Sequence, residues 1–130
     1  MDATPLDFQK ATPIGARIGE LKGEPGGYDH NFVLESQGYP KLVAVGSVYH
    51  PKTGRLLEMF TTEPGVQLYS GNYLDGKLTG KGGQVYNKHA GLCLEAQHFP
   101  DAVNQPKFPS VVLQPGKQYK QLTVYKLSTK

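Results

Sequence analysis

Glycine and proline recur along this chain at short intervals, and this spacing is the strongest constraint on its fold. The 130 residues include 16 glycines and 10 prolines, and both residue types weaken or interrupt helices and strand interiors. Between them lie short runs in which apolar and polar side chains alternate, which is the period of a half-buried strand. No run of helical period is long enough to predict a helix. The sequence therefore predicts an all-β chain, an antiparallel β-sandwich or part of one.

The alternating runs define the strands that we predict. Residues 42–49 and 55–62 flank a Pro-Lys-Thr-Gly turn at 51–54, so we expect a hairpin with a four-residue loop. Residues 70–83 contain five glycines and are predicted to form a long loop, which at this length is more often functional or disordered than idle. The other extended segments that we predict are residues 7–8, 14–18, 28–34, 66–69, 92–97, 111–113 and 118–127.

Composition and charge exclude several classes of protein. The net charge is +3, with lysines and arginines scattered along the chain, so we predict no surface for nucleic acid. The N-terminus lacks the pattern of a secretory signal, and no apolar run approaches the length of a membrane span. We therefore expect one domain, residues 1–130, that lies in the cytoplasm and does not bind membranes.

Cys93 is the only cysteine of the chain, so an internal disulfide is impossible. Because it lies within an apolar run, we predict that its thiol is packed. No histidine or second cysteine stands at the spacing of metal ligands, and we predict no metal site.

Glu95 is the strand residue that most needs an explanation. The run Gly-Leu-Cys-Leu-Glu-Ala-Gln at residues 91–97 alternates, which places Glu95 on the face opposite the leucines. Glutamate is depleted in strands and is rarely buried without a partner. From the residues alone two interpretations stay open: a carboxylate that faces water, or a general base at the floor of a cleft.

Asp29 and Gln67 have the same kind of position in two other predicted strands. Each is expected on the face opposite an apolar stripe, Asp29 in residues 28–34 and Gln67 in residues 66–69. From the residues alone, a surface carboxylate and an exposed strand glutamine account for both.

Three segments, in this order, resemble motifs of the aldose 1-epimerases, the galactose mutarotase family. They read GYDHNF at residues 27–32, TTEPGVQLYSGNYLDG at 61–76 and GLCLEAQHFPDAVNQP at 91–106. The resemblance runs from about residue 4 to the end of the chain and covers only the C-terminal, smaller part of such an enzyme. It implies the C-terminal portion of the large twisted β-sandwich of that family, whose curved inner face holds the sugar.

The resemblance also implies roles for the three polar residues. Glu95 matches the family's general base, Asp29 matches its sugar-binding aspartate, and Gln67 matches a polar residue of the same pocket. Mutarotation needs one base for the anomeric hydroxyl proton and one acid for the ring oxygen. It requires no metal and no organic cofactor, and the implied ligand is a monosaccharide, an aldohexose.

The acid of the family is a histidine in a motif N-terminal to the matched region. The histidines present, His30, His50, His89 and His98, do not match that motif. We therefore expect the isolated chain to be a poor catalyst or none. An incomplete sandwich would expose apolar faces and strand edges, so we also expect self-association or a need for the missing N-terminal half.

Two other functions stay open. The first is a non-catalytic carbohydrate-binding or interaction module on the same sandwich. The second is an epimerase of phosphorylated hexoses, which needs cationic residues around the phosphate. The match of the Asp-Ala-Val-Asn-Gln-Pro segment at residues 101–106 to the branch that uses unphosphorylated sugars ranks this second alternative last.

Overall fold

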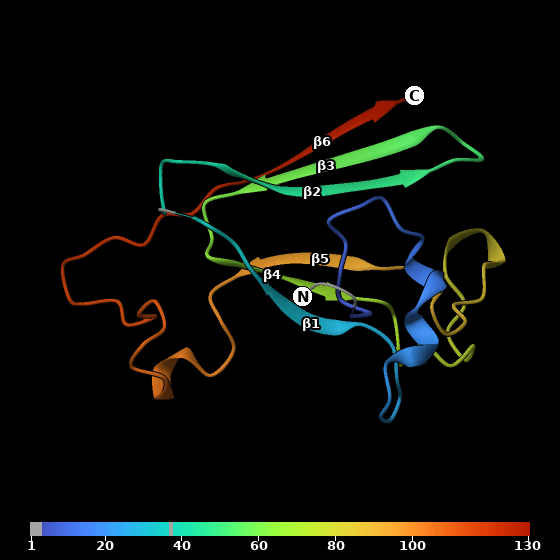
Figure 1. Ribbon diagram of the computed structural model, residues 1–130, viewed down its shortest axis with the longest axis horizontal. Coiled ribbons are helices and arrows are strands. Elements are labelled where there is room, and N and C mark those ends of the chain that lie inside the picture. The colour runs from blue at the N-terminus through green and yellow to red at the C-terminus, as the bar shows by residue number, and fades with distance from the viewer. Residues whose placement is uncertain (1–3, 37) are drawn as a thin grey trace. The chain divides into compact units, whose positions relative to one another are not determined.

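A computed structural model describes residues 4–36 and 38–130 of the chain (Figure 1). The chain divides into two compact units, one of Met1–His30 with Leu68–Leu94 and the other of Asn31–Gln67 with Glu95–Lys130. The strands are β1 (Asp29–Val33), β2 (Val43–His50), β3 (Arg55–Thr61), β4 (Gly65–Tyr69), β5 (Cys93–Gln97) and β6 (Thr123–Thr129). They form two three-stranded sheets, of order β1-β4-β5 and β2-β3-β6.

The predicted all-β fold is confirmed. The helical segments of the described residues are single 3₁₀ turns, at Ile14–Ala16, Ile18–Glu20, Lys81–Gly83 and Ala102–Asn104. None of the helices in the described part of the chain is long and apolar enough to cross a membrane. Whether the chain is a single domain, as the length suggests, stays a prediction.

The β2-β3-β6 sheet lies within the second unit and is antiparallel throughout. His50 pairs with Arg55 at the end of the hairpin, so the predicted four-residue loop at 51–54 is confirmed. Met59 of β3 is fully buried. On the opposite face of this sheet, Glu58 of β3 and Lys126 of β6 form an ion pair of 2.9 Å.

The β1-β4-β5 sheet carries the three predicted site residues. Its central strand β4 alternates as predicted, with Val66 and Leu68 buried and Gln67 half-buried. Because side chains alternate between faces, Gln67 and the two apolar side chains project from opposite faces of the sheet.

The first unit is organised around Tyr28, whose side chain is fully buried. The backbone N–H of Tyr28 donates to Ser70 Oγ at 2.9 Å, and its carbonyl accepts from Asn72 Nδ2 at 2.8 Å. Gly27 lies directly beside Asn72 with φ +98°. The backbone of Tyr28 is thereby hydrogen-bonded to the segment that contains Ser70 and Asn72, which is distant in sequence.

Several predicted extended segments are wrong. Residues 14–18 form 3₁₀ turns, the first closed by Ala16 N–H to the Pro13 carbonyl at 3.0 Å, and residues 7–8 form no strand. Residues 111–113 are irregular, because Val112 N–H donates to Ser110 Oγ at 3.2 Å instead of joining a neighbouring strand.

The last strand and the thiol also differ from expectation. The strand predicted at 118–127 begins only at Thr123, because Leu122 N–H donates to Thr62 Oγ1 at 3.0 Å and not to a ladder carbonyl. Cys93, predicted to be packed, is exposed. The alternation of the sequence places the Cys93 side chain on the same face of β5 as Glu95. Both side chains are exposed.

Candidate active site

The predicted site residues stand on the three strands of one sheet. Glu95 is at the centre of β5 and exposed, whereas Gln67 is half-buried in β4. Both belong to the second unit. Asp29 opens β1 in the first unit and is exposed, and its backbone N–H donates to His30 Nδ1 at 3.0 Å. Each residue was predicted on the polar face of its strand.

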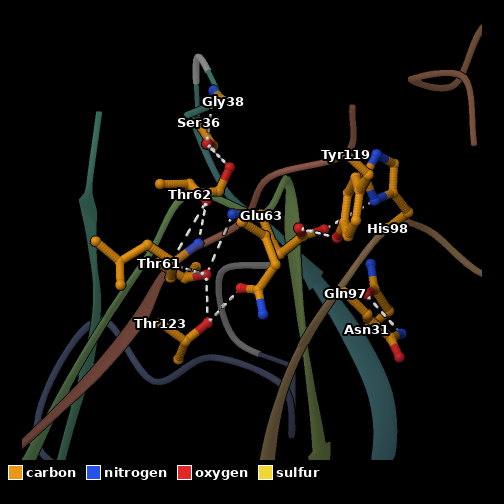
Figure 2. A network of polar contacts seen from close by, with 12 residues as sticks. Asn31, Ser36, Gly38, Thr61, Thr62, Glu63, Gln97, His98, Tyr119 and Thr123 are labelled. Atoms are coloured by element: carbon orange, nitrogen blue, oxygen red, sulfur yellow. Dashed lines mark hydrogen bonds and ion pairs between the residues drawn. The ribbon is translucent and has the colours of Figure 1, made fainter. Parts of the chain in front are cut away.

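Within the second unit, a chain of amides connects Gln67 to the base strand. Gln97 Nε2 donates to Gln67 Oε1 at 3.3 Å and to Asn31 Oδ1 at 3.1 Å, and Figure 2 shows the pair of Asn31 and Gln97. Gln97 follows Glu95 by two residues on β5, so their side chains share a face. The structure therefore connects Gln67 with the neighbour of Glu95, and sequence reasoning had assigned no role to Gln97.

His98 and Tyr119 contact the buried carboxylate of Glu63 and form a second polar cluster with it (Figure 2). Tyr119 Oη donates to Glu63 Oε1 at 2.5 Å. His98 Nδ1 lies 2.8 Å from Glu63 Oε2. Because that oxygen has no hydrogen-bond partner among the described residues, the contact with His98 is an ion pair, formed when the imidazole is protonated, and not an aligned hydrogen bond.

The Glu63 carboxylate changes the chemistry of Tyr119. The hydrogen bond to Glu63, followed by burial and by the negative charge of Glu63, raises the pKa of Tyr119 to about 12. A Tyr119 phenolate would have no proton to donate to Glu63 and would lie beside a second negative charge, so the neutral phenol is favoured.

Threonine hydroxyls hold the backbone that carries Glu63. The N–H of Glu63 donates to Thr61 Oγ1 at 3.1 Å, and that hydroxyl lies 3.0 Å from Thr123 Oγ1 (Figure 2). Ser36 Oγ donates to the Thr62 carbonyl at 2.7 Å. The N–H of Glu63 and the carbonyl of Thr62, in the buried segment before β4, are thus hydrogen-bonded by side chains, as buried backbone requires.

A cavity of about 490 Å³ adjoins this cluster in the second unit, with Tyr39, Glu63, His98, Tyr119 and Lys120 among its lining residues. The sequence analysis assigned no role to Glu63, which lies within the second of the three family motifs. The available signal was a charged residue between two predicted strands, which does not by itself identify a partner.

The other histidines make local contacts. His89 Nδ1 lies 2.8 Å from the Ser70 carbonyl, and His50 Nδ1 lies 2.8 Å from Thr53 Oγ1 in the hairpin loop. His98 contacts Glu63, as described above. No group of three or more histidine, cysteine, aspartate or glutamate side chains in the described residues is arranged to hold a metal ion.

Comparison with known proteins identifies the family. The family model described as aldose 1-epimerase matches residues 1–126. This chain belongs to the aldose 1-epimerase family. Among curated relatives, the galactose mutarotases of Rattus norvegicus and Homo sapiens are each 46% identical to it over 128 residues. The aldose 1-epimerase of Escherichia coli is 36% identical over 126 residues.

The chain spans only 36% of the length of these relatives, although the mutarotase matches cover 98% of the chain itself. A crystal structure of a GalM/aldose epimerase homologue from C. elegans matches 98% of the chain and 38% of the homologue, with 29% identity and a TM-score of 0.78. These matches confirm the resemblance to part of an aldose 1-epimerase and the fold that it implied.

Proposed function

We propose that this chain carries the base half of a mutarotase site and acts on the anomers of an aldohexose such as galactose or glucose. Glu95 is the general base, and Asp29 and Gln67 bind the sugar hydroxyls. The observation that carries the proposal is the position of Glu95, an exposed carboxylate at the centre of a strand whose flanking sequence matches the family. Relatives with this family's sequence are named for mutarotation of galactose.

The proposed reaction needs only proton transfers. The Glu95 carboxylate accepts the proton of the anomeric hydroxyl while the bond between C1 and the ring oxygen breaks and an acid protonates that oxygen. Rotation about C1–C2 exchanges the faces of the carbonyl, and the same groups reverse their roles on closure. A carboxylate accepts hydrogen bonds from two hydroxyls at once, which suits Asp29 to neighbouring sugar hydroxyls.

The acid in this proposal comes from outside the matched region. The relatives extend well beyond the part that this chain matches, and a proton donor supplied by such a segment or by a partner chain completes the site. Without it, catalysis falls by roughly a hundredfold to ten-thousandfold, the usual contribution of one acid–base group. We also propose that the chain associates with itself or with that missing half, and that it acts in the cytoplasm.

Polarimetry of freshly dissolved α-D-galactose and α-D-glucose tests the proposal. The chain is compared with Glu95→Gln, with Glu35→Gln as a matched control at an exposed position, and with a protein-free blank. We expect the isolated chain, which lacks the acid, to raise the rate above the blank weakly or not at all, and any increase to be abolished by Glu95→Gln and preserved by Glu35→Gln. An increase that survives Glu95→Gln would overturn the role of Glu95.

The second candidate is a non-catalytic sugar-binding module. The observation that favours it is the small share of the relatives' length that the chain spans. Equilibrium titration with galactose separates the two functions, because a binding module would retain its affinity in Glu95→Gln and give no turnover at any protein concentration.

A further inference from the structure

The cavity beside Glu63 is distinct from the proposed sugar site. Its volume is about 490 Å³, and its lining residues all belong to the second unit. Gln67 and Glu95 belong to the same unit but are not among the residues that line it. Cavities of roughly 300–1,000 Å³ with a few polar groups are typical of sites for small ligands. The side chains around this cavity therefore indicate which ligand it could hold.

The carboxylate of Glu63 is already engaged by the protein. Its side chain is buried, Oε1 accepts the hydrogen bond of Tyr119 Oη, and Oε2 lies 2.8 Å from His98 Nδ1. A buried carboxylate needs a countercharge to remain ionised, and the protonated imidazole of His98 supplies one. In that form the pair of Glu63 and His98 adds no net charge to the cavity.

Two tyrosine rings supply apolar surface. Tyr39 and Tyr119 both line the cavity, and both are exposed. The hydrogen bond to Glu63, followed by burial, raises the pKa of Tyr119 to about 12, so at neutral pH its phenol adds no negative charge. The rings can therefore contact the body of a ligand without repelling an anion.

Lys120 brings a positive charge that no other described residue balances. It lines the cavity, and it forms no ion pair within the part of the chain that the structure describes. Its Nζ lies 5.9 Å from the centroid of the Tyr39 ring, within the range of a cation–π contact. One ammonium group thus stands beside one of the two exposed rings.

We propose that this cavity binds a small organic monocarboxylate, with the carboxylate paired to Lys120 and the body against the rings of Tyr39 and Tyr119. One uncompensated ammonium suits one negative charge. A phosphate monoester carries more than one, and its excess charge would be repelled by the Glu63 carboxylate. The inference is independent of the proposed function, since neither Gln67 nor Glu95 takes part.

NMR titration with sodium benzoate and with sodium D-galacturonate tests the inference. The titrations are made at low ionic strength, because salt screens the ion pair, and at about pH 6, below the ordinary pKa of histidine. The methyl resonances of Leu113, which lines the cavity, report occupancy. We expect at least one probe to give saturable shifts, and the probe that does so identifies an aromatic or a sugar-like body. Absence of saturation with both probes would overturn the inference.

Uncharged analogues and two lysine variants test the role of the charge. Benzamide and D-galactose, which lack the carboxylate, should leave the Leu113 resonances unchanged. Lys120→Gln should weaken binding about fivefold, the upper end for an exposed ion pair. Lys117→Gln makes the same change at an exposed position that does not line the cavity and should preserve affinity. Equal affinities of the wild type and Lys120→Gln, equal losses in the two variants, or saturable binding of an uncharged analogue as tight as that of its carboxylate would each overturn the inference.

Discussion

The hydroxyl of Tyr119 donates a 2.5 Å hydrogen bond to the buried carboxylate of Glu63, across 56 positions of sequence. Glu63 is only 4% exposed, and removing its donor leaves a buried oxygen without that hydrogen bond. We expect Tyr119→Phe to destabilise the protein by about 1 kcal/mol, less than the roughly 1.5–3 kcal/mol of a hydrogen bond to a charged group, because the Tyr119 side chain is exposed. Urea unfolding measures the loss, and Tyr49→Phe at an exposed position should show none.

The same contact predicts a dependence of stability on alkaline pH. The pKa of Tyr119 is about 12 in the folded protein, above its ordinary value of 10.0, so the folded state holds this proton more tightly than the unfolded state. The resulting stabilisation is fully present below pH 10 and is lost as the pH rises from 10 to 12. We expect the urea midpoint of the wild type to fall more than that of Tyr119→Phe over this range. Parallel curves would contradict the prediction.

Met59 anchors the β2-β3-β6 sheet. Its side chain is fully buried, so Met59→Ala removes apolar contacts and leaves a cavity, at a cost of about 2–5 kcal/mol. Leu127 in the neighbouring strand is 75% exposed, and Leu127→Ala should change the free energy of unfolding by less than about 0.5 kcal/mol. Similar losses in the two variants would show that Leu127 is covered in solution.

Gly27 and Gly82 form a matched pair that separates backbone strain from crowding. Both have positive φ, +98° and +68°, but a Cβ atom at Gly27 would lie 2.3 Å from Asn72 Oδ1, whereas nothing lies within 4 Å at Gly82. Alanine at Gly82 should cost about 1 kcal/mol from φ alone. Gly27→Ala should cost more, since Asn72 must give up its bond to Tyr28. Thermal unfolding of the two variants compares these costs, and equal losses would argue against crowding.

Local patterns were sufficient to predict most of the strands. The hairpin over residues 42–62 was found because its alternation and its turn lie next to each other in sequence. Residues 111–113 have the composition of a strand, but Val112 N–H bonds to Ser110 Oγ, and a side chain that competes for a backbone donor has no signature in the apolar pattern.

The site was predictable only in part. Strand alternation placed Gln67 and Glu95 on the polar faces of their strands, and the family motifs gave them roles. Glu63 could not be paired with Tyr119 in advance, because a contact between distant segments depends on tertiary folding and leaves no local periodicity. The hydrogen bonds of Gln97 to Gln67 and Asn31 could not be predicted for the same reason, because they join side chains on three different strands.

The exposure of Cys93 gives the chain a natural reporter. It is the only thiol, and it precedes Glu95 by two residues on the same face of β5. A fluorophore attached there would occupy one defined position beside the proposed base without any substitution. Ligand occupancy could then be followed as an optical signal even in a chain that turns over no sugar.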